Sequence, residues 1–265
     1  MNLPRDSDGN VVSEGISISM EPFPDGLTEL RRVLSLREIM ALIEKTARWV
    51  SPETFKLLPI WFPEHARRGL FYKGKWSEPQ MNTSRATGQS VHKTEGNIHA
   101  NKALTLALGL RKNLRKNWSC CHIWGVDDAS YQLSNLVIQD HAFFSCVGNM
   151  VLLPTPLKAF TDTMPEVKAL LRICAFNLYG WQCDHEHLSA TNEALSKWTD
   201  WEAYPESWPM KQGEGVPLGV VELNATIRTS ADKRLAAIRH DLEHAGEFYP
   251  REKVLAALEY WKVEL

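Results

Sequence analysis

The pattern of apolar and polar residues predicts a chain made mostly of α-helices. Apolar side chains recur every three or four residues, which places them on one face of a helix. Six segments show this spacing: 27–50, 97–113, 165–179, 189–201, 219–246 and 250–265. We expect the first helix to end at Ser51-Pro52 and the fifth to be broken near Thr229-Ser230, with Ser230 as a cap. Segment 165–179 is apolar on nearly every side, which is typical of a central core helix.

Two short apolar runs interrupt the helical pattern in the middle of the chain. Residues 120–125 predict a strand that ends at Gly125, and residues 149–153 predict a second strand that breaks at Pro154. Thr155 can then cap a short helix that has Pro156 in its first turn. The predicted fold class is therefore α+β, mostly α-helical, with an embedded ββα unit.

The residues of this ββα unit resemble the HNH endonuclease family, whose site is a ββα-metal motif. His122-Ile123 matches the first motif element, and Asn149 followed by Val151, Leu152 and Leu153 matches the second. Leu157 and Asp162 stand where the family has a leucine and an aspartate after the second strand. Two positions depart from the family: Lys158 replaces the last histidine, and Cys121 stands where an acidic or histidine ligand is common. The resemblance covers 120–162 only.

This resemblance implies a divalent-metal-dependent DNA endonuclease. Phosphodiester hydrolysis needs a base for the attacking water and positive charge for the phosphate. His122 is the expected base, and Asn149 and Asp162 are the expected ligands of Mg²⁺ or Mn²⁺, which prefer oxygen donors. Lys158 or Arg115 is expected to contact a phosphate. The departure at Lys158 has a second interpretation, in which its charge repels the metal and the site is inactive.

Each of these residues also has an ordinary structural explanation. A single histidine on an apolar strand is commonly a hydrogen-bonded core residue. Asn149 next to Gly148 is a common turn pair, and Lys158 suits any solvated helix surface. The loop at 126–148 is long for a connection inside a domain, which favours a function, and its apolar residues indicate that it is packed.

Positive charge is concentrated directly before the candidate site. Residues 64–116 contain eleven Lys or Arg and three Glu, a formal +8, in a chain with a net charge of −2. Such a block favours a phosphate-binding surface, although basic and acidic residues also mix on ordinary surfaces. The residues expected to bind DNA are Arg85, Lys93, Lys102, Arg111, Lys112, Arg115 and Lys116. The last four also suit the C-terminal end of helix 97–113.

Composition places the chain among cytoplasmic globular proteins. It has 265 residues, 44% of them hydrophobic, and no apolar run long enough to span a membrane. Residues 1–15 are polar and lack the apolar core of a signal peptide, and five cysteines favour reduced thiols. We divide the chain into a basic helical DNA-binding region (1–117), the HNH-like core (118–180) and a C-terminal helical region (181–265), forming one compact unit.

Two further histidine groups are weaker metal candidates. Cys183, His185 and His187 have no recognised zinc-finger spacing and suit an exposed turn, so zinc is not expected. His240 and His244 share a helix face with acidic neighbours but lack the metalloprotease pattern, which favours a solvated face.

The preferred function is an HNH-type endonuclease, with a restriction or phage-defence role suggested by analogy alone. The residues do not separate DNA from RNA, and cleavage of both strands at a symmetric site would suggest a homodimer. One alternative is a non-catalytic nucleic-acid-binding protein that keeps the ββα unit as a scaffold. Another is an interaction protein that uses a Trp-rich surface, since the chain has ten tryptophans.

Overall fold

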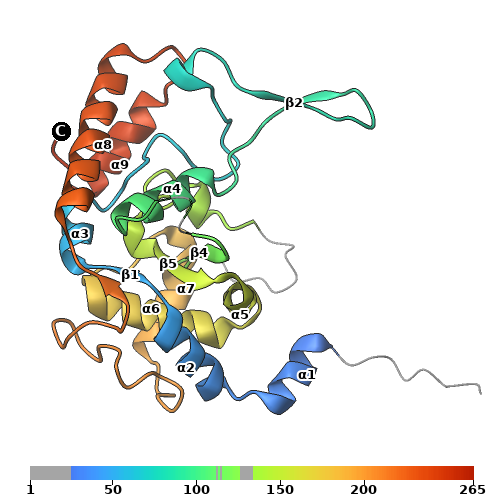
Figure 1. Ribbon diagram of the computed structural model, residues 1–265, viewed down its shortest axis with the longest axis vertical. Coiled ribbons are helices and arrows are strands. Elements are labelled where there is room, and N and C mark those ends of the chain that lie inside the picture. Colours follow the sequence, from blue (N-terminus) through green and yellow to red (C-terminus); the bar gives the residue numbers. More distant parts are fainter. Residues whose placement is uncertain (1–24, 112, 114, 126–133) are drawn as a thin grey trace, which may run out of the picture. The chain divides into compact units, whose positions relative to one another are not determined.

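The computed structural model describes residues 25–111, 113, 115–125 and 134–265 (Figure 1). The chain forms two units, Met1–Ser35 and Leu36–Leu265. In the first unit, helix α1 (Gly26–Val33) begins after Asp25, whose carboxylate accepts a hydrogen bond from the backbone N–H of Thr28 at 2.9 Å. None of the described helices combines the length and apolar character needed to cross a membrane.

The second unit is α+β, as predicted. Its helices are α2 (Leu36–Thr46), α3 (Pro52–Leu57), α4 (Ile98–Ala107), α5 (Lys158–Thr163), α6 (Pro165–Tyr179), α7 (Ser189–Ser196), α8 (Ala225–His244) and α9 (Arg251–Tyr260). Short 3-10 turns lie at η1 (Gly74–Trp76), η3 (Val137–Gln139), η4 (Val147–Asn149), η5 (Thr155–Leu157) and η6 (Glu186–Leu188). The five cysteines are buried free thiols, which agrees with the prediction of reduced cysteines.

Three two-stranded sheets are present in the described residues. Strand β4 (Trp118–His122) pairs antiparallel with β5 (Met150–Pro154), so that His122 lies opposite Met150. Strands β2 (Met81–Thr83) and β3 (Ser90–His92) form an exposed antiparallel hairpin that extends from the rest of the unit (Figure 1). Strand β1 (Trp49–Val50) pairs in parallel with β6 (Val220–Val221). This parallel pair needs Gly219, because a Cβ there would lie 2.2 Å from the Ala47 carbonyl oxygen.

Helix α6 is the central core helix, as the sequence predicted. Eleven of its fifteen residues are buried, and it ends at Gly180. The hydroxyl of Tyr179 donates to the Val50 carbonyl at 2.9 Å. Arg172 is buried and donates to the carbonyl oxygens of Ile123 and Gly125, at 3.0 and 2.8 Å. Helix α6 therefore fixes the point where the chain leaves β4.

Several predicted helix boundaries were wrong. The single helix expected over 27–50 is two helices followed by β1, and Ser51 caps α3 by accepting from the Thr54 N–H at 3.2 Å. Helix α8 runs without a break through Ser230, whose hydroxyl donates back to the Thr226 carbonyl at 2.8 Å. The cap of α8 is Asn224, which accepts from the Ile227 N–H at 3.1 Å.

Helix α4 is shorter than the predicted segment 97–113, which changes the position of the basic residues after it. The helix ends at Ala107, before Gly109, which has a φ of 61°. Its last turn contains no basic residue. Arg111, Arg115 and Lys116 therefore lie beyond the last turn of this helix, and the explanation by the helix dipole was wrong for these three residues.

Candidate functional site

The predicted order of strand, strand and helix is present at β4, β5 and α5 (Figure 1). His122 is the last residue of β4. Its Nε2 is 2.9 Å from the carbonyl oxygen of Phe144. A carbonyl oxygen only accepts, so Nε2 carries the hydrogen and Nδ1 keeps its lone pair. No hydrogen bond to Nδ1 is found within the described residues. The Phe144 carbonyl thus selects the tautomer in which Nδ1 is the basic atom.

The surroundings of His122 keep its ring neutral. Burial lowers the pKa of His122 to about 4, against the opposing effect of the Phe144 carbonyl. The positive charges of Arg67, Lys168 and Lys158 lower this pKa further. Three cations therefore lie close enough to act electrostatically on the imidazole. Of these three cations, only Lys158 was predicted to belong to the site, because Arg67 and Lys168 come from segments outside the predicted ββα unit.

The neutral ring predicts that stability depends on pH. Between the folded pKa of about 4 and the ordinary value of 6.5, the unfolded chain binds more protons at His122 than the folded protein does. The free energy of unfolding therefore falls as pH decreases through this window, and this residue contributes no pH dependence above it. Lowering pH from 7 to 5 should cost about 2 kcal/mol through this residue.

Urea unfolding at both pH values measures this effect. The variant His122→Gln keeps a side-chain N–H donor but cannot titrate, so its loss of stability between the two pH values should be smaller by the same amount. An equal pH dependence in the variant and the wild type would contradict the assigned cause.

Asn149 does not present a ligand atom to a cation in this structure. Its side chain is fully buried. Its Oδ1 accepts from the Trp124 N–H at 2.6 Å, and its Nδ2 donates to the Phe143 carbonyl at 3.1 Å. Its own carbonyl accepts from the Ile123 N–H at 2.8 Å. Asn149 therefore connects the end of β4 to the turn that carries the Phe144 carbonyl. Its role is to position the backbone around His122.

Lys158 and Asp162 form an ion pair along one face of α5. The ammonium therefore already neutralises the carboxylate that the sequence analysis assigned to Mg²⁺ or Mn²⁺. Because the Asn149 amide is sealed and Asp162 is paired, these two residues do not fit the expected hard cation. Asp127 and Asp128, two nearby oxygen donors, lie outside the described residues.

Several of the predicted DNA-binding residues have structural tasks. Arg115 donates to the Asn101 carbonyl at 2.7 Å and to Asn101 Oδ1 at 2.8 Å, so it clamps α4. The ammonium of Lys93 lies 4.4 Å from the centre of the Phe71 ring, and that of Lys102 lies 5.0 Å from the Phe62 ring. Arg85, in the turn of the β2–β3 hairpin, is exposed, as are Arg111 and Lys116; Lys112 lies outside the described residues.

Half of the ten tryptophans are buried in the core. Trp49, Trp61, Trp124 and Trp208 are almost completely buried. These buried tryptophans cannot contribute to the Trp-rich interaction surface that the sequence suggested. Trp118, Trp181, Trp198 and Trp261 are partly exposed, and Trp201 has 41% of its surface exposed.

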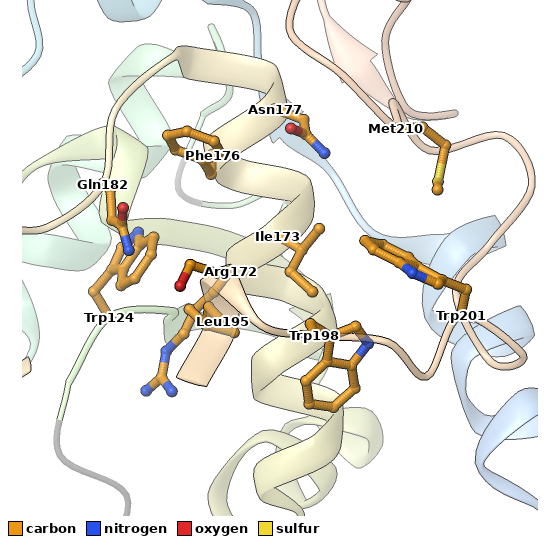
Figure 2. A pocket seen from close by; sticks show the side chains of 11 residues that line it. Trp124, Arg172, Ile173, Phe176, Asn177, Gln182, Leu195, Trp198, Trp201 and Met210 are labelled. Carbon is orange, nitrogen blue, oxygen red and sulfur yellow. The ribbon is translucent and has the colours of Figure 1, made fainter. Parts of the chain in front are cut away.

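A pocket of about 280 Å³ opens beside α6 (Figure 2). Trp124, Trp198 and Trp201 line it together with Ile173 and Met210. Three of its polar residues are engaged within the protein: Arg172 holds the end of β4, the Asn177 amide donates to the Pro209 carbonyl at 2.8 Å, and the Ser196 hydroxyl donates to the Glu193 carbonyl at 2.7 Å. Gln182 also lines the pocket, and the indole N–H of Trp124 has no hydrogen-bond partner among the described residues. The pocket is therefore an aromatic hollow with few polar groups.

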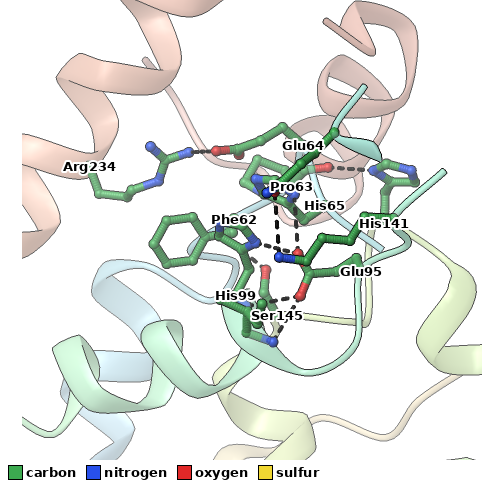
Figure 3. A network of polar contacts seen from close by, with 12 residues as sticks. Phe62, Pro63, Glu64, His65, Glu95, His99, His141, Ser145 and Arg234 are labelled. Carbon is green, nitrogen blue, oxygen red and sulfur yellow. Dashed lines mark hydrogen bonds and ion pairs between the residues drawn. The ribbon is translucent and has the colours of Figure 1, made fainter. Parts of the chain in front are cut away.

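A second polar cluster, which sequence reasoning missed, contains His65, Glu95 and His99 (Figure 3). Glu95 precedes α4, and its Oε1 accepts from the Ile98 N–H at 2.8 Å. Its Oε2 lies 2.6 Å from Nδ1 of His99 and 3.8 Å from Nδ1 of His65. Burial lowers the pKa of His65 to about 2, with His99 as the next cause. The spacing of Glu95 and His99, one helical turn apart, was the available sequence signal.

Cys183, His185 and His187 do not join a metal-sized cluster within the described part of the chain. Burial raises the pKa of the Cys183 thiol to about 12, which keeps it protonated. The His185 and His187 rings stack on each other with centres 5.2 Å apart.

Comparisons with protein-family models, curated proteins and solved structures gave no match for this chain.

Proposed function

We propose that this protein is a DNA endonuclease in which His122 is the general base. The observation that carries the proposal is the hydrogen bond from His122 Nε2 to the Phe144 carbonyl at 2.9 Å. It orients the ring and leaves Nδ1 as the proton acceptor, which is what activation of a water molecule requires. The similarity of 120–162 to the HNH pattern supports the same role.

In the proposed reaction, a water molecule attacks the phosphorus atom of a phosphodiester and gives its proton to Nδ1 of His122. The bond between phosphorus and the leaving oxygen then breaks, and that oxygen takes a proton from solvent. The positive charges of Arg67, Lys158 and Lys168 offset the charge that develops on the phosphate. A bound phosphate would also raise the pKa of the imidazole and improve it as a base.

No step of this scheme passes through a metal ion, because the residues expected to bind Mg²⁺ or Mn²⁺ do not fit one. Arg85, Arg111 and Lys116 supply the exposed positive charge for binding the polynucleotide. Lys158 has two tasks in this scheme, pairing with Asp162 at rest and turning to the phosphate when a substrate binds.

The test is incubation of the full chain with supercoiled plasmid, in EDTA and with added Mg²⁺ or Mn²⁺. Nicking or linearisation in EDTA would support the scheme as written. Cleavage only with an added cation would keep the nuclease assignment but show that other ligands, or a rearranged site, bind the metal. The same incubation with single-stranded RNA separates the two classes of polynucleotide.

A non-catalytic nucleic-acid-binding protein is the second candidate function. The sealed amide of Asn149 and the closed Lys158–Asp162 pair favour it, because both are what a retained scaffold would need. Plasmid binding that weakens with salt, without cleavage under any condition, would select this function. A gel shift without binding at low salt would exclude both candidates.

A further inference from the structure

The cluster of His65, Glu95 and His99 brings together the ligand types of a small metal site. The two imidazole rings stack, with an interplanar angle of 7° and centres 3.3 Å apart. Because an imidazole binds a metal in the plane of its own ring, one of the two rings must turn for both to bind the same ion. One potential ligand atom from each residue can be chosen so that all three lie within 4.8 Å of one another. The side chains are 7%, 1% and 15% exposed in the order His65, Glu95, His99. Two nitrogens and one oxygen of mostly buried side chains thus lie close together.

Hydrogen bonding within the protein does not explain the whole arrangement. Glu95 Oε2 bonds to His99, but its distance of 3.8 Å from His65 Nδ1 is too long for a hydrogen bond. His65 is therefore directed at a carboxylate oxygen to which it does not bond. A metal ion bound by both rings and the carboxylate would use this convergence.

The neighbouring residue supplies an independent observation. Glu64 Oε2 is buried and has no hydrogen-bond partner among the described residues, while Glu64 Oε1 pairs with Arg234. The charge of His99 acts on the Glu64 carboxyl, so Glu64 lies close to the cluster. A water molecule bound to a metal would provide the donor that this oxygen lacks.

We propose that His65, Glu95 and His99 bind one divalent transition-metal ion of the zinc class. Two imidazoles and one carboxylate are a ligand set that zinc accepts, with a water molecule in the fourth position. Nitrogen donors favour zinc or cobalt over magnesium, so this ion differs in kind from the hard cation expected at Asn149. The ion connects the segment that carries His65 to the first turn of α4. Its role is structural: it stabilises the fold. This proposal does not depend on the nuclease assignment.

The charges around the cluster are compatible with such an ion. Arg234 is neutralised by Glu64, and the Lys102 ammonium lies over the Phe62 ring. Arg234 also lies over this ring, 4.5 Å from its centre, and its Nε donates to the Trp61 carbonyl at 2.6 Å. The nearby Arg and Lys side chains are thus held by groups other than Glu95.

The experiment uses the full chain, stripped of metal by a chelator and then dialysed against Zn²⁺ or Co²⁺. We expect one equivalent of bound ion by elemental analysis, a visible Co²⁺ absorption typical of low coordination number, and a higher Tm with Zn²⁺. The variant His65→Ala should lose the bound equivalent and the Tm shift. The double variant His240→Ala/His244→Ala, at an exposed histidine pair, should retain both.

A second variant protects the test against misfolding. Glu95→Gln keeps an oxygen for the Ile98 N–H, and therefore the start of α4, but removes the carboxylate charge. It should keep the circular dichroism spectrum of the wild type and lose the bound ion. A wild type that binds neither Zn²⁺ nor Co²⁺, or a Glu95→Gln variant that still binds one equivalent, would overturn the proposal.

Discussion

Replacing His122 with glutamine is expected to slow plasmid cleavage by about 10²- to 10⁴-fold, the contribution of a well-placed general base. Glutamine can carry an N–H donor to the Phe144 carbonyl, which the histidine bonds at 2.9 Å. The variant therefore keeps the buried carbonyl partnered and loses only the basic nitrogen. Single-turnover cleavage rates of the wild type and the variant measure the effect directly.

The matched control is His240→Gln, the same exchange at an exposed position on α8. It should cleave at the wild-type rate. Circular dichroism and Tm should show that His122→Gln remains folded at pH 7. Cleavage by His122→Gln at the wild-type rate would show that His122 is not the general base. This result would not affect the proposal of a metal site at His65.

The pH dependence of cleavage gives an additional signature of this base. Because the pKa of His122 is lowered to about 4, its activity should persist below the ordinary histidine value of 6.5. Substrate binding raises this pKa, so the acid limb of kcat should lie at higher pH than that of kcat/KM.

Replacing Asn149 with alanine is expected to lower the free energy of unfolding by about 3 kcal/mol, because two buried groups lose their partners. These groups are the Trp124 N–H and the Phe143 carbonyl, which the amide bonds at 2.6 and 3.1 Å. Cleavage should fall as well, since the turn that positions His122 loosens. Urea unfolding measures the stability term.

Asn149→Asp separates this positioning role from a role as metal ligand. A carboxylate would bind Mg²⁺ at least as well as an amide, so a ligand role predicts retained cleavage. The positioning role predicts a destabilised, poorly active protein, because one carboxylate oxygen would face the Phe143 carbonyl without a hydrogen between them. Asn82→Ala, on the exposed β2–β3 hairpin, serves as the control and should leave stability nearly unchanged.

Local sequence signals were sufficient for some elements. Helix α6 is a dense apolar segment between Pro165 and Gly180, and β5 is an apolar run limited by Pro154. The strand predicted over 120–125 lies instead at Trp118–His122 and ends before Gly125. The separation of α1 from α2 was missed because apolar spacing continues across Ser35, through Leu34 and Leu36. The β2–β3 hairpin was missed because its residues are mostly polar and exposed on both faces.

The site depended on contacts that the sequence does not encode locally. His122 was found from its neighbours in the chain, but the task of Asn149 is set by backbone groups of Trp124 and Phe143. His65 is brought to Glu95 only by the folded chain, so no spacing rule relates them. Arg115 was predicted to contact a phosphate because its hydrogen bonds to Asn101, fourteen positions earlier, are visible only in the folded chain.

The parallel pairing of β1 with β6 has a consequence for synthesis of the protein. Residues 49–50 obtain their strand partner only from residues 220–221, and Trp61 receives its bond from Arg234, 173 positions later. The Ala142 carbonyl accepts its hydrogen bond from the indole N–H of Trp261, 119 positions later. A ribosome-bound chain therefore holds an unfinished core until its last helices emerge, and such chains expose apolar surface for longer. Residues 220–261 therefore complete the core last, so that loss of this segment is expected to be more damaging than its separation from His122 along the chain suggests.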